Sequence, residues 1–308
     1  MIDRTEKNFR CGFVSIVGRP NVGKSTLLNR ILGEKVAIVS RVPQTTRNQI
    51  RGIYHDERGQ IVFIDTPGYH LVKDKFDEFM NQTSLMTTED TDCIIYLVDT
   101  SRKIGEEEKI LSEKLKSLTV PLILGLNKID LKGTYVPAYI SLWEEAKKMP
   151  VTQMDFFTLL PLSAKEGIHI DKLLDILFEY MPEGPALYPS DTICDVPQKM
   201  ALADLIREKF LILMRQEIPH SLCVVVEDMQ PRKNKMMFIR ALILVEQESQ
   251  KEIVIGKKGW ILKEVGSLAR AELEELLETK VFLELKVKTQ KRWRDDITVL
   301  KELGYSNF

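Results

Sequence analysis

Gly18-Arg-Pro-Asn-Val-Gly23-Lys24-Ser25 matches the pattern G-x-x-x-x-G-K-[S/T], and it stands between an apolar run and a helical pattern. The run before it, Phe13–Val17, is typical of a strand, and Ser25–Leu32 carries apolar residues at helical spacing. A glycine-rich turn in this position lets successive backbone N–H groups point at phosphate oxygens beside a helix N-terminus. Lys24 would bridge the β- and γ-phosphates, and the Ser25 hydroxyl would bind Mg²⁺. The stretch therefore predicts a loop that binds a nucleoside triphosphate.

Around this loop, strand-like apolar runs alternate with helical patterns up to about residue 180. The expected strands are Phe13–Val17, Ile50–Tyr54, Gln60–Ile64, Cys93–Val98, Pro121–Leu126 and Phe156–Leu162, and the expected helices are Ser25–Leu32, Lys73–Thr88, Glu106–Ser117, Val136–Met149 and Ile170–Tyr180. The alternation predicts an α/β domain with a mostly parallel six-stranded sheet covered on both faces by helices. The hairpin Ile50–Ile64 would supply one antiparallel edge strand.

A second motif, Asn127-Lys-Ile-Asp130, directly follows the expected strand Pro121–Leu126. The Asp130 carboxylate can accept from both N1–H and the exocyclic amino group of guanine, whereas adenine offers no such pair of donors. The lysine stem can lie over the base, and the asparagine can tie this loop to the phosphate loop. Ser163-Ala-Lys165 follows the next strand and would place the Ala164 N–H against guanine O6. The two motifs predict GTP rather than ATP.

Two further segments lie between these motifs. Asp65-Thr-Pro-Gly68 follows the strand Gln60–Ile64, where Asp65 suits an outer-shell role at Mg²⁺ through water, and the Gly68 N–H can bond the γ-phosphate. Upstream, Pro43-Gln-Thr-Thr-Arg47 offers hydroxyl groups to the metal. Loss of the γ-phosphate would free both segments, which is a common order–disorder switch.

The residues expected to contact the nucleotide form four segments. They are Gly18, Arg19, Pro20, Asn21, Val22, Gly23, Lys24, Ser25 and Thr26; Asp65, Thr66, Pro67, Gly68 and Tyr69; Asn127, Lys128, Ile129 and Asp130; and Ser163, Ala164 and Lys165. Lys24 is expected to stabilise transition-state charge, and no residue is assigned as a general base. His70 follows the second segment and is expected to be an exposed spectator.

A proline-rich stretch from Met181 to Pro197 separates this part from a different order of elements. The expected elements after it are a helix at Lys199–Gln216, strands at Ser221–Glu227 and Met236–Val245, a short helix or irregular chain at Gln250–Ile255, a helix at Trp260–Leu277, a strand at Val281–Lys288 and a tail from Thr289. This order predicts a smaller α+β domain. The expected boundaries are residues 1–182 for the first domain, 183–198 for the linker and 199–308 for the second domain with its tail.

The second domain contains Gly256-Lys-Lys-Gly259 between an apolar Ile253-Val-Ile run and an amphipathic helix with expected core positions 262, 265, 269, 273 and 276. This arrangement of apolar run, glycine segment and helix resembles the KH module. It resembles the type of KH module in which an extra helix and strand precede the core. There Gly256 and Gly259 let a single-stranded backbone approach, and Lys257 and Lys258 supply charge for phosphates. A basic cluster at residues 286–294 has two interpretations: Arg292 and Trp293 contact RNA, with the indole stacking on a base, or the indole packs on the domain.

Composition excludes several classes of protein. The chain has 308 residues, a formal net charge of −1 and 44% hydrophobic residues, which is typical of an ordinary folded protein. No apolar run approaches the ~18 residues of a membrane span, and Met1–Lys7 lacks the apolar core of a secretion signal. The four cysteines and four histidines show no metal-binding spacing. Cys11 and Cys93 lead into apolar runs, so buried free thiols and a reducing cytoplasm are expected.

Together the phosphate loop, Gln44-Thr-Thr-Arg47, Asp65–Gly68, Asn127–Asp130 and Ser163–Lys165 look like the motifs of translation-factor-related GTPases. With the second domain added, the chain resembles the Era family over nearly its whole length. The resemblance implies a P-loop GTPase domain followed by a smaller type II KH domain, and it implies hydrolysis of GTP to GDP and phosphate.

The resemblance also implies details of the site. Thr46, rather than Thr45, would complete the Mg²⁺ site with Ser25 and the water-linked Asp65. Tyr69 stands where Ras-like enzymes carry the glutamine that orients water, so hydrolysis would rely on positioned water, Mg²⁺ and backbone groups. Asn21 could help bind a K⁺ ion in place of an arginine finger.

The implied partners are the small-subunit (16S) ribosomal RNA near its 3′ end and the 30S subunit during its assembly. A cytoplasmic monomer is expected, and a weak peripheral contact with the inner membrane stays open. The alternative is a regulatory adaptor in which GTP gates the docking of a protein or membrane partner and the C-terminal domain is only an interaction fold.

Overall fold

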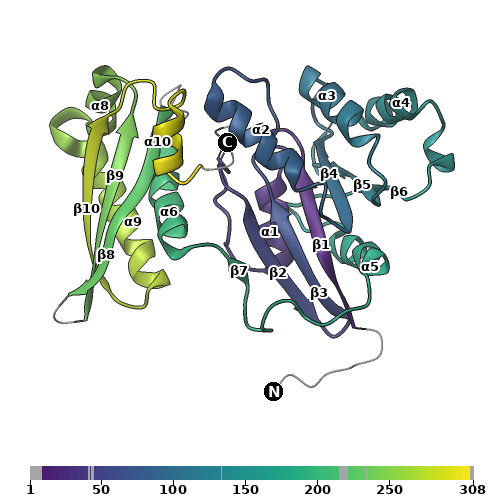
Figure 1. Cartoon of the computed structure of the whole chain (residues 1–308), viewed down its shortest axis with the longest axis horizontal. Helices are drawn as coiled ribbons and strands as arrows, with labels where there is room; N and C mark the ends of the chain where they lie inside the picture. Colours follow the sequence, from purple (N-terminus) through teal and green to yellow (C-terminus); the bar gives the residue numbers. More distant parts are fainter. Residues whose placement is uncertain are drawn as a thin grey trace. The chain divides into compact units, whose positions relative to one another are not determined.

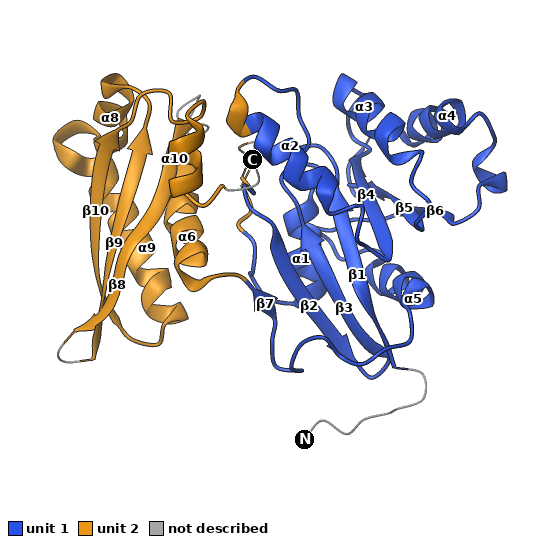
Figure 2. Cartoon of the chain, viewed as in Figure 1, with its two compact units in different colours: residues 1–37, 46–73, 77–195 blue, residues 38–45, 74–76, 196–308 orange. Residues whose placement is uncertain are grey.

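The computed structural model describes residues 9–40, 42, 45–132, 134–214, 221–232 and 235–305, so Pro43 and Gln44 of the expected metal-binding segment lie outside the described residues. The chain forms two compact units (Figure 2). The first comprises residues 1–37, 46–73 and 77–195, and the second comprises residues 38–45, 74–76 and 196–308.

The first unit is built on a seven-stranded sheet in the order β6-β5-β4-β1-β3-β2-β7 (Figure 1). Its strands are β1 (Arg10–Val17), β2 (Ile50–Asp56), β3 (Gly59–Asp65), β4 (Cys93–Asp99), β5 (Leu122–Asn127), β6 (Phe157–Pro161) and β7 (Cys194–Asp195). Its helices are α1 (Lys24–Leu32), α2 (Lys75–Met86), α3 (Glu106–Leu115), α4 (Val136–Lys147), the short 3₁₀ turn Val151–Gln153 and α5 (Ile170–Tyr180). Every pairing from β6 to β3 is parallel, and β2 pairs antiparallel with both β3 and β7.

The buried strands explain this architecture. Every residue of β3 and β4 is buried, as continuous apolar runs are when helices cover both faces of a parallel sheet. Leu111 of α3 and Trp143 of α4 pack in one apolar cluster with residues of β4 and β5. Cys11 and Cys93 are buried free thiols, as expected.

The sheet has one strand more than the six predicted. Cys194 and Asp195 pair with Gly52 and Arg51 of β2, inside the stretch expected to be a linker. A two-residue strand has no periodicity of its own, and its pairing depends on an edge that only the folded sheet offers. The prediction of a mostly parallel α/β sheet is otherwise confirmed.

The second unit has a three-stranded sheet in the order β10-β9-β8, with β9 and β10 parallel and β8 and β9 antiparallel. Its elements are α6 (Gln198–Leu213), β8 (Cys223–Arg232), β9 (Met236–Val245), α8 (Glu248–Ile255), the 3₁₀ turn Lys257–Gly259, α9 (Trp260–Leu276), β10 (Lys280–Thr289) and α10 (Ile297–Glu302). Of the expected core positions on α9, Val265, Ala269 and Leu273 are buried, whereas Leu262 is only partly buried. Leu276 is exposed, because it ends the helix.

The stretch after β10 is not a solvated tail. Asp296 accepts hydrogen bonds from the backbone N–H groups of Thr298 and Val299 and so caps α10. Leu300 and Tyr305 are buried. A six-residue helix carries too little periodicity to be predicted without its packing partners.

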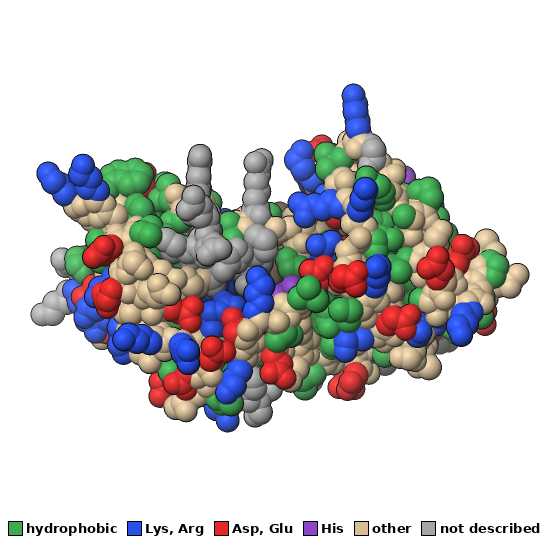
Figure 3. Space-filling view, turned by 90° about the horizontal axis from the view of Figure 1, so that it is seen from above, with side chains coloured by type: hydrophobic (Ala, Val, Ile, Leu, Met, Phe, Trp, Pro, Cys, Tyr) green, Lys and Arg blue, Asp and Glu red, His purple; other side chains and the backbone are tan. Residues whose placement is uncertain are grey.

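No helix within the described ranges is both long enough and apolar enough to span a bilayer. On the face drawn in Figure 3, basic and acidic side chains are interspersed, and the formal net charge of the chain is −1. Binding of an anionic partner must therefore come from a local site rather than from a field over the whole surface.

Candidate functional site

The four nucleotide-contact segments expected from the sequence follow the carboxyl ends of β1, β3, β5 and β6. These four strands run parallel in one sheet, so their carboxyl ends lie at the same edge. In open α/β sheets this edge is where ligands bind. The topology therefore gathers motifs that are more than 100 residues apart in the sequence into one site.

The phosphate loop ends on a helix that no side chain caps. Gly23 adopts a left-handed conformation before α1, without a side-chain cap and without an acidic residue in the first turn. The first-turn N–H groups are thus available to an anion. Glycine is required at both ends of the loop, because a Cβ at Gly18 would lie 2.3 Å from the Leu97 carbonyl oxygen, and one at Gly23 would lie 2.5 Å from the Asn127 amide nitrogen.

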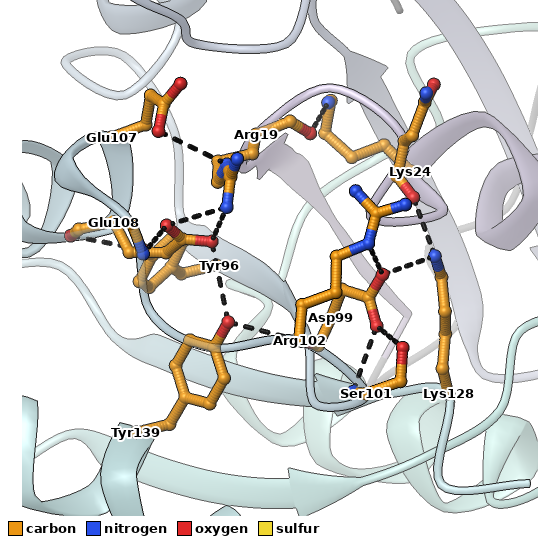
Figure 4. Close-up of polar contacts among 12 residues, drawn as sticks. Arg19, Lys24, Tyr96, Asp99, Ser101, Arg102, Glu107, Glu108, Lys128 and Tyr139 are labelled. Atoms are coloured by element: carbon orange, nitrogen blue, oxygen red, sulfur yellow. Dashed lines mark hydrogen bonds and ion pairs between the residues drawn. The ribbon is translucent and has the colours of Figure 1, made fainter. Parts of the chain in front are cut away.

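Lys24 lies almost fully buried under this loop. Its Nζ donates to the carbonyl oxygens of Gly18 at 3.1 Å and Arg19 at 3.0 Å, and Figure 4 shows the side chain in this position. Burial lowers its pKa to about 8, and the nearby Asp65 carboxylate opposes that shift. The loop therefore holds a poorly solvated ammonium group, which a phosphate group would stabilise.

Ser25, Thr46 and Asp65 come together as the sequence suggests. The Ser25 hydroxyl lies 2.8 Å from Thr46 Oγ1 and donates to Asp65 Oδ2 at 2.7 Å. Thr45 instead donates to the Val42 carbonyl oxygen at 2.6 Å, which favours Thr46 as the metal-site threonine.

The same cluster fits a hard cation. Burial raises the pKa of Asp65 to about 6, and Lys24 opposes this shift. Among the residues that the structure describes, none donates a hydrogen bond to the buried Asp65 Oδ1. Two hydroxyl oxygens and a carboxylate are ligands that Mg²⁺ accepts. Elsewhere in the described part of the chain, no cluster of three His, Cys, Asp or Glu side chains could hold a metal.

The guanine-site motif is joined to the phosphate loop by two hydrogen bonds. Asn127 Nδ2 donates to the Val22 carbonyl oxygen at 2.7 Å. Lys128 Nζ donates to the Asn21 carbonyl oxygen at 2.8 Å and pairs with Asp99 at 2.6 Å (Figure 4). These two bonds fix the Lys128 ammonium group beside the phosphate loop.

The loop after β6 differs from expectation at one atom. The Ala164 N–H donates to Asn127 Oδ1 at 2.9 Å, so in this structure it does not stand free to face guanine O6. The reason is that the Asn127 amide bridges the two loops, giving its nitrogen to one and its oxygen to the other. Asp130 is held by this loop as well, since Ser163 Oγ donates to its Oδ1 at 2.6 Å.

The side chain of Arg19 is directed to α3. Its guanidinium bonds Glu108 at 2.9 Å and lies 3.5 Å from Glu107 (Figure 4). The buried Glu108 carboxylate also accepts from the Gly105 N–H at 2.8 Å and the Tyr139 hydroxyl at 3.4 Å. Sequence reasoning missed Glu108 and Asp99, because nothing in either local sequence marks them as partners of the phosphate loop.

The segment after β3 lies directly on the phosphate loop. A Cβ at Gly68 would lie 2.5 Å from the Pro20 nitrogen, and the Tyr69 N–H donates to the Gly18 carbonyl oxygen at 3.1 Å. The Tyr69 side chain is buried in the apolar cluster of β4, β5, α3 and α4. The side chain therefore packs on the domain, and the expectation that hydrolysis relies on other groups to orient water stays a prediction. His70 is buried and hydrogen-bonded, so the expectation of an exposed spectator is wrong.

In the second unit the Gly256–Gly259 turn has the backbone of a tight loop. Gly256 has φ 74°, Lys258 has φ 54° and Gly259 has φ 76°. A Cβ at Gly256 would lie 2.8 Å from the Ile261 side chain, so only glycine fits there. The side chains of Lys257 and Lys258 are exposed. The turn thus presents two exposed ammonium groups beside a bare backbone.

A groove of about 550 Å³ runs from this turn between α9 and β10. It is lined by Gly259, Leu262, Lys263, Gly266, Ser267 and Arg270 on the helix side and by Val281, Phe282, Leu283 and Leu285 on the strand side. Sequence reasoning missed the helix wall. The sequence pattern that could have predicted this wall is a second face of α9, beside its core face, with small and basic residues at 263, 266, 267 and 270.

Trp293 does not belong to this surface. Its indole is fully buried, and Nε1–H donates to the Ser221 carbonyl oxygen at 3.0 Å. The interpretation in which Trp293 stacks on RNA is therefore wrong, and the alternative in which it packs on the domain is confirmed. Burying an indole whose N–H is satisfied stabilises the fold more than exposing it would. Arg292, next to it, is exposed.

We expect Trp293→Phe to lower the free energy of unfolding of the second unit by about 1–3 kcal/mol, because it leaves a gap and the Ser221 carbonyl oxygen without its donor. The control is Trp260→Phe, since Trp260 is 59% exposed and its loss should cost less than ~0.5 kcal/mol. Urea denaturation followed by far-ultraviolet circular dichroism measures both. Equal stabilities of the two variants would contradict the burial of Trp293.

Comparison with known proteins finds relatives of both units. Residues 13–128 match the family described as 50S ribosome-binding GTPase, and residues 217–294 match the KH domain family. The chain is 44% identical to GTPase Era of Halothermothrix orenii over 97% of this chain and 99% of that protein. It is 46% identical to GTPase Era of Geobacter sp. strain M21, over 98% of this chain and 99% of that protein.

Two solved structures match with a TM-score of 0.88 and 37% identity over 96% of this chain and 99% of theirs. One is Era in complex with MgGDPNP and nucleotides 1506–1542 of 16S ribosomal RNA, and the other is a point variant of Aquifex aeolicus Era bound to GDP.AlF4⁻. With relatives of this identity along nearly the whole chain, the protein belongs to the Era family of GTPases, with a P-loop GTPase domain followed by a KH domain.

Proposed function

We propose that this GTPase is a switch that binds 16S ribosomal RNA near its 3′ end and acts in assembly of the 30S subunit. One observation carries the proposal: the chain joins the Lys24–Ser25–Asp65 site to a KH unit whose groove opens beside two exposed lysines. The relative solved with MgGDPNP and nucleotides 1506–1542 of 16S ribosomal RNA supports the same pairing of ligands.

In the first unit, the nucleotide would lie along the four segments at the carboxyl edge of the sheet. Ser25 and Thr46 would hold Mg²⁺ directly and Asp65 through water, and the bound ion supplies charge neutralisation on the β- and γ-phosphates. Lys24 supports the same charge, and the Gly68 N–H would meet the γ-phosphate. When the γ-phosphate leaves, these contacts are lost, and the affinity for RNA changes.

Hydrolysis in this proposal uses no arginine of the phosphate loop. Arg19 is bound to Glu108, so its charge is already neutralised away from the phosphates. We therefore propose that a K⁺ ion, with Asn21 as one ligand, would supply the further positive charge at the phosphates. Activity in K⁺ against Na⁺ buffers tests this point directly.

In the second unit, a single strand of RNA would run along the groove, with its backbone over the Gly256–Gly259 turn. A Cβ at Gly266, in the middle of the helix wall, would make only an ordinary contact with Leu285 at 3.6 Å, so a small side chain would also fit there. Lys263 and Arg270 add charge along the wall. The ring of Phe282 stacks on Phe238 on the other face of the sheet, because it alternates with Val281, Leu283 and Leu285, which face α9. Basic groups along a groove suit the phosphate backbone of a single-stranded nucleic acid.

The proposed location is the cytoplasm, and the proposed state is a monomer. All four cysteines are free thiols, which suits a reducing compartment. A weak peripheral contact with the membrane is a secondary part of the proposal. No feature of the described surface favours it.

We expect Lys257→Glu/Lys258→Glu in the full chain to weaken binding of a single-stranded RNA with the 3′-terminal 16S sequence at least tenfold. Two phosphate contacts are lost, so the slope of log affinity against log salt should fall by about one to two. Fluorescence anisotropy with labelled RNA at several salt concentrations measures both. GTP turnover without RNA should not change.

The matched control is Lys114→Glu/Lys172→Glu, which makes the same charge change on exposed helix positions of the first unit. It should keep wild-type affinity at physiological salt. Unchanged RNA binding in the Lys257/Lys258 variant would favour the alternative function, a GTP-regulated adaptor for a protein or membrane partner.

A further inference from the structure

The imidazole of His70 lies between two oxygen acceptors. Nδ1 is 2.7 Å from the carbonyl oxygen of Gly68, and Nε2 is 2.9 Å from Asp77 Oδ1. His70 is 9% exposed, and Asp77 is fully buried. A carbonyl oxygen only accepts, so Nδ1 donates the bond to Gly68.

The backbone of His70 is fixed as well. Its N–H donates to Asn81 Oδ1 at 3.1 Å, and its carbonyl oxygen accepts from Asn81 Nδ2 at 2.6 Å. Asp77 and Asn81 are four residues apart on α2 and so lie on one face of that helix. Asp77 Oδ2 in turn accepts from the Lys73 N–H at 3.0 Å. His70 is therefore bonded to α2 through both its side chain and its main chain.

Through His70, α2 holds one particular peptide group. The peptide between Gly68 and Tyr69 gives its N–H to the Gly18 carbonyl oxygen at 3.1 Å, and its C=O accepts the bond from His70. Both polar atoms of this planar unit are thus fixed, one to the phosphate loop and the other to α2. The preceding peptide, between Pro67 and Gly68, contains the Gly68 N–H, which is the group proposed above to meet the γ-phosphate. The two planes share the Gly68 Cα, so holding one restricts the other.

We propose that His70 is a positioning residue for GTP hydrolysis, because its Nδ1–H sets the Gly68–Tyr69 peptide and thereby the Gly68 N–H at the γ-phosphate. The inference rests on the proposed role of Gly68. It gives His70 no part in proton transfer to water, since both ring nitrogens are engaged by Gly68 and Asp77. The role concerns the triphosphate and its transition state, because GDP has no γ-phosphate for the Gly68 N–H to meet.

Two amide substitutions separate the two bonds. His70→Asn places an amide nitrogen near the position of Nδ1 and keeps the bond to Gly68, while it loses Asp77. His70→Gln reaches the position of Nε2 and keeps Asp77, while it loses Gly68. We expect His70→Gln to lower kcat for GTP about tenfold, the effect of one lost hydrogen bond, and to change KM and the Kd for GDP less than about twofold. His70→Asn should keep kcat within about threefold of wild type.

Steady-state hydrolysis and titration with a fluorescent GDP analogue give all three constants on the full chain, and the GDP affinity also reports whether each variant is folded. Equal losses of kcat in both variants, or parallel losses of kcat and GDP affinity, would overturn the positioning role and leave His70 a structural residue. Wild-type kcat in His70→Gln would overturn it too. Failure of the wild-type protein itself to bind GTP would instead overturn the proposed nucleotide site.

Discussion

Replacing Asp130 with asparagine should weaken GTP binding by about 100- to 10,000-fold and should create binding of xanthosine triphosphate. In the proposed site the Asp130 carboxylate would accept from two donors of guanine, and hydrogen bonds to a charged group contribute about 1.5–3 kcal/mol each. An amide offers one acceptor and one donor, so one guanine donor would face an N–H. Xanthine presents a carbonyl oxygen where guanine has its amino group, and it therefore matches the amide.

The Asp130 carboxylate is oriented by Ser163, whose hydroxyl donates to Oδ1 at 2.6 Å. Ser163→Ala is thus the matched control, because it frees the carboxylate without changing what it can accept. We expect that variant to weaken GTP binding about tenfold at most and not to gain binding of xanthosine triphosphate. Competition against a fluorescently labelled guanine nucleotide measures both preferences. If Asp130→Asn kept wild-type affinity for GTP, the assignment of the guanine site would be wrong.

The sequence analysis predicted the motifs of the nucleotide site because each motif is short, contiguous and placed at the end of a parallel strand. The parallel order of the strands then brings Lys24, Asp65 and Asn127 to the same edge of the sheet. Thr46, which the resemblance preferred to Thr45, is also the threonine that lies beside Ser25.

The sequence could not show which distant side chains contact each other, because only the packing of the folded chain brings them together. Arg19 and Glu108 are 89 residues apart, and neither residue type predicts the other at that distance. The bonds of His70 depend on where the first two turns of α2 lie against the loop. Periodicity places residues on faces of single elements, and these contacts are made between elements.

Trp293 illustrates a different failure. An aromatic within a basic cluster is typical of nucleic-acid surfaces, and the local sequence left that interpretation open. The folded chain settles it, because Ser221, 72 residues earlier, supplies an acceptor for the indole N–H in a buried position. The groove beside α9, by contrast, was present in the sequence as a helical face, but it required the position of β10 to be identified.

Replacing Lys24 with methionine should abolish tight triphosphate binding and, at the same time, stabilise the nucleotide-free first unit by about 1–3 kcal/mol. The loss of affinity, about 100-fold or more, follows from removing charge-assisted bonds to two phosphates. The gain in stability follows from burial, which lowers the folded-state pKa of Lys24 from 10.5 to about 8. A lowered lysine pKa destabilises the fold by its full amount below pH 8, and this destabilisation disappears as the pH rises towards 10.5.

Methionine has a similar length, no charge and a flexible side chain that can fill the same space. It cannot donate to the carbonyl oxygens of Gly18 and Arg19, and this loss offsets part of the gain. Lys24→Arg is the control, because it retains a buried charge and should not stabilise the nucleotide-free unit. Urea denaturation from about pH 7 to pH 10.5 should show a rise in wild-type stability that Lys24→Met lacks.

Nucleotide should reverse the order of the two proteins. At about 100 times its Kd, GDP stabilises the wild-type fold by about 2.7 kcal/mol, and it should do little for Lys24→Met. The methionine variant would then be the more stable protein without nucleotide and the less stable one with it. A variant that was destabilised in both conditions would show that the bonds of the ammonium group to Gly18 and Arg19 outweigh its burial, and wild-type triphosphate affinity in the variant would contradict the phosphate site.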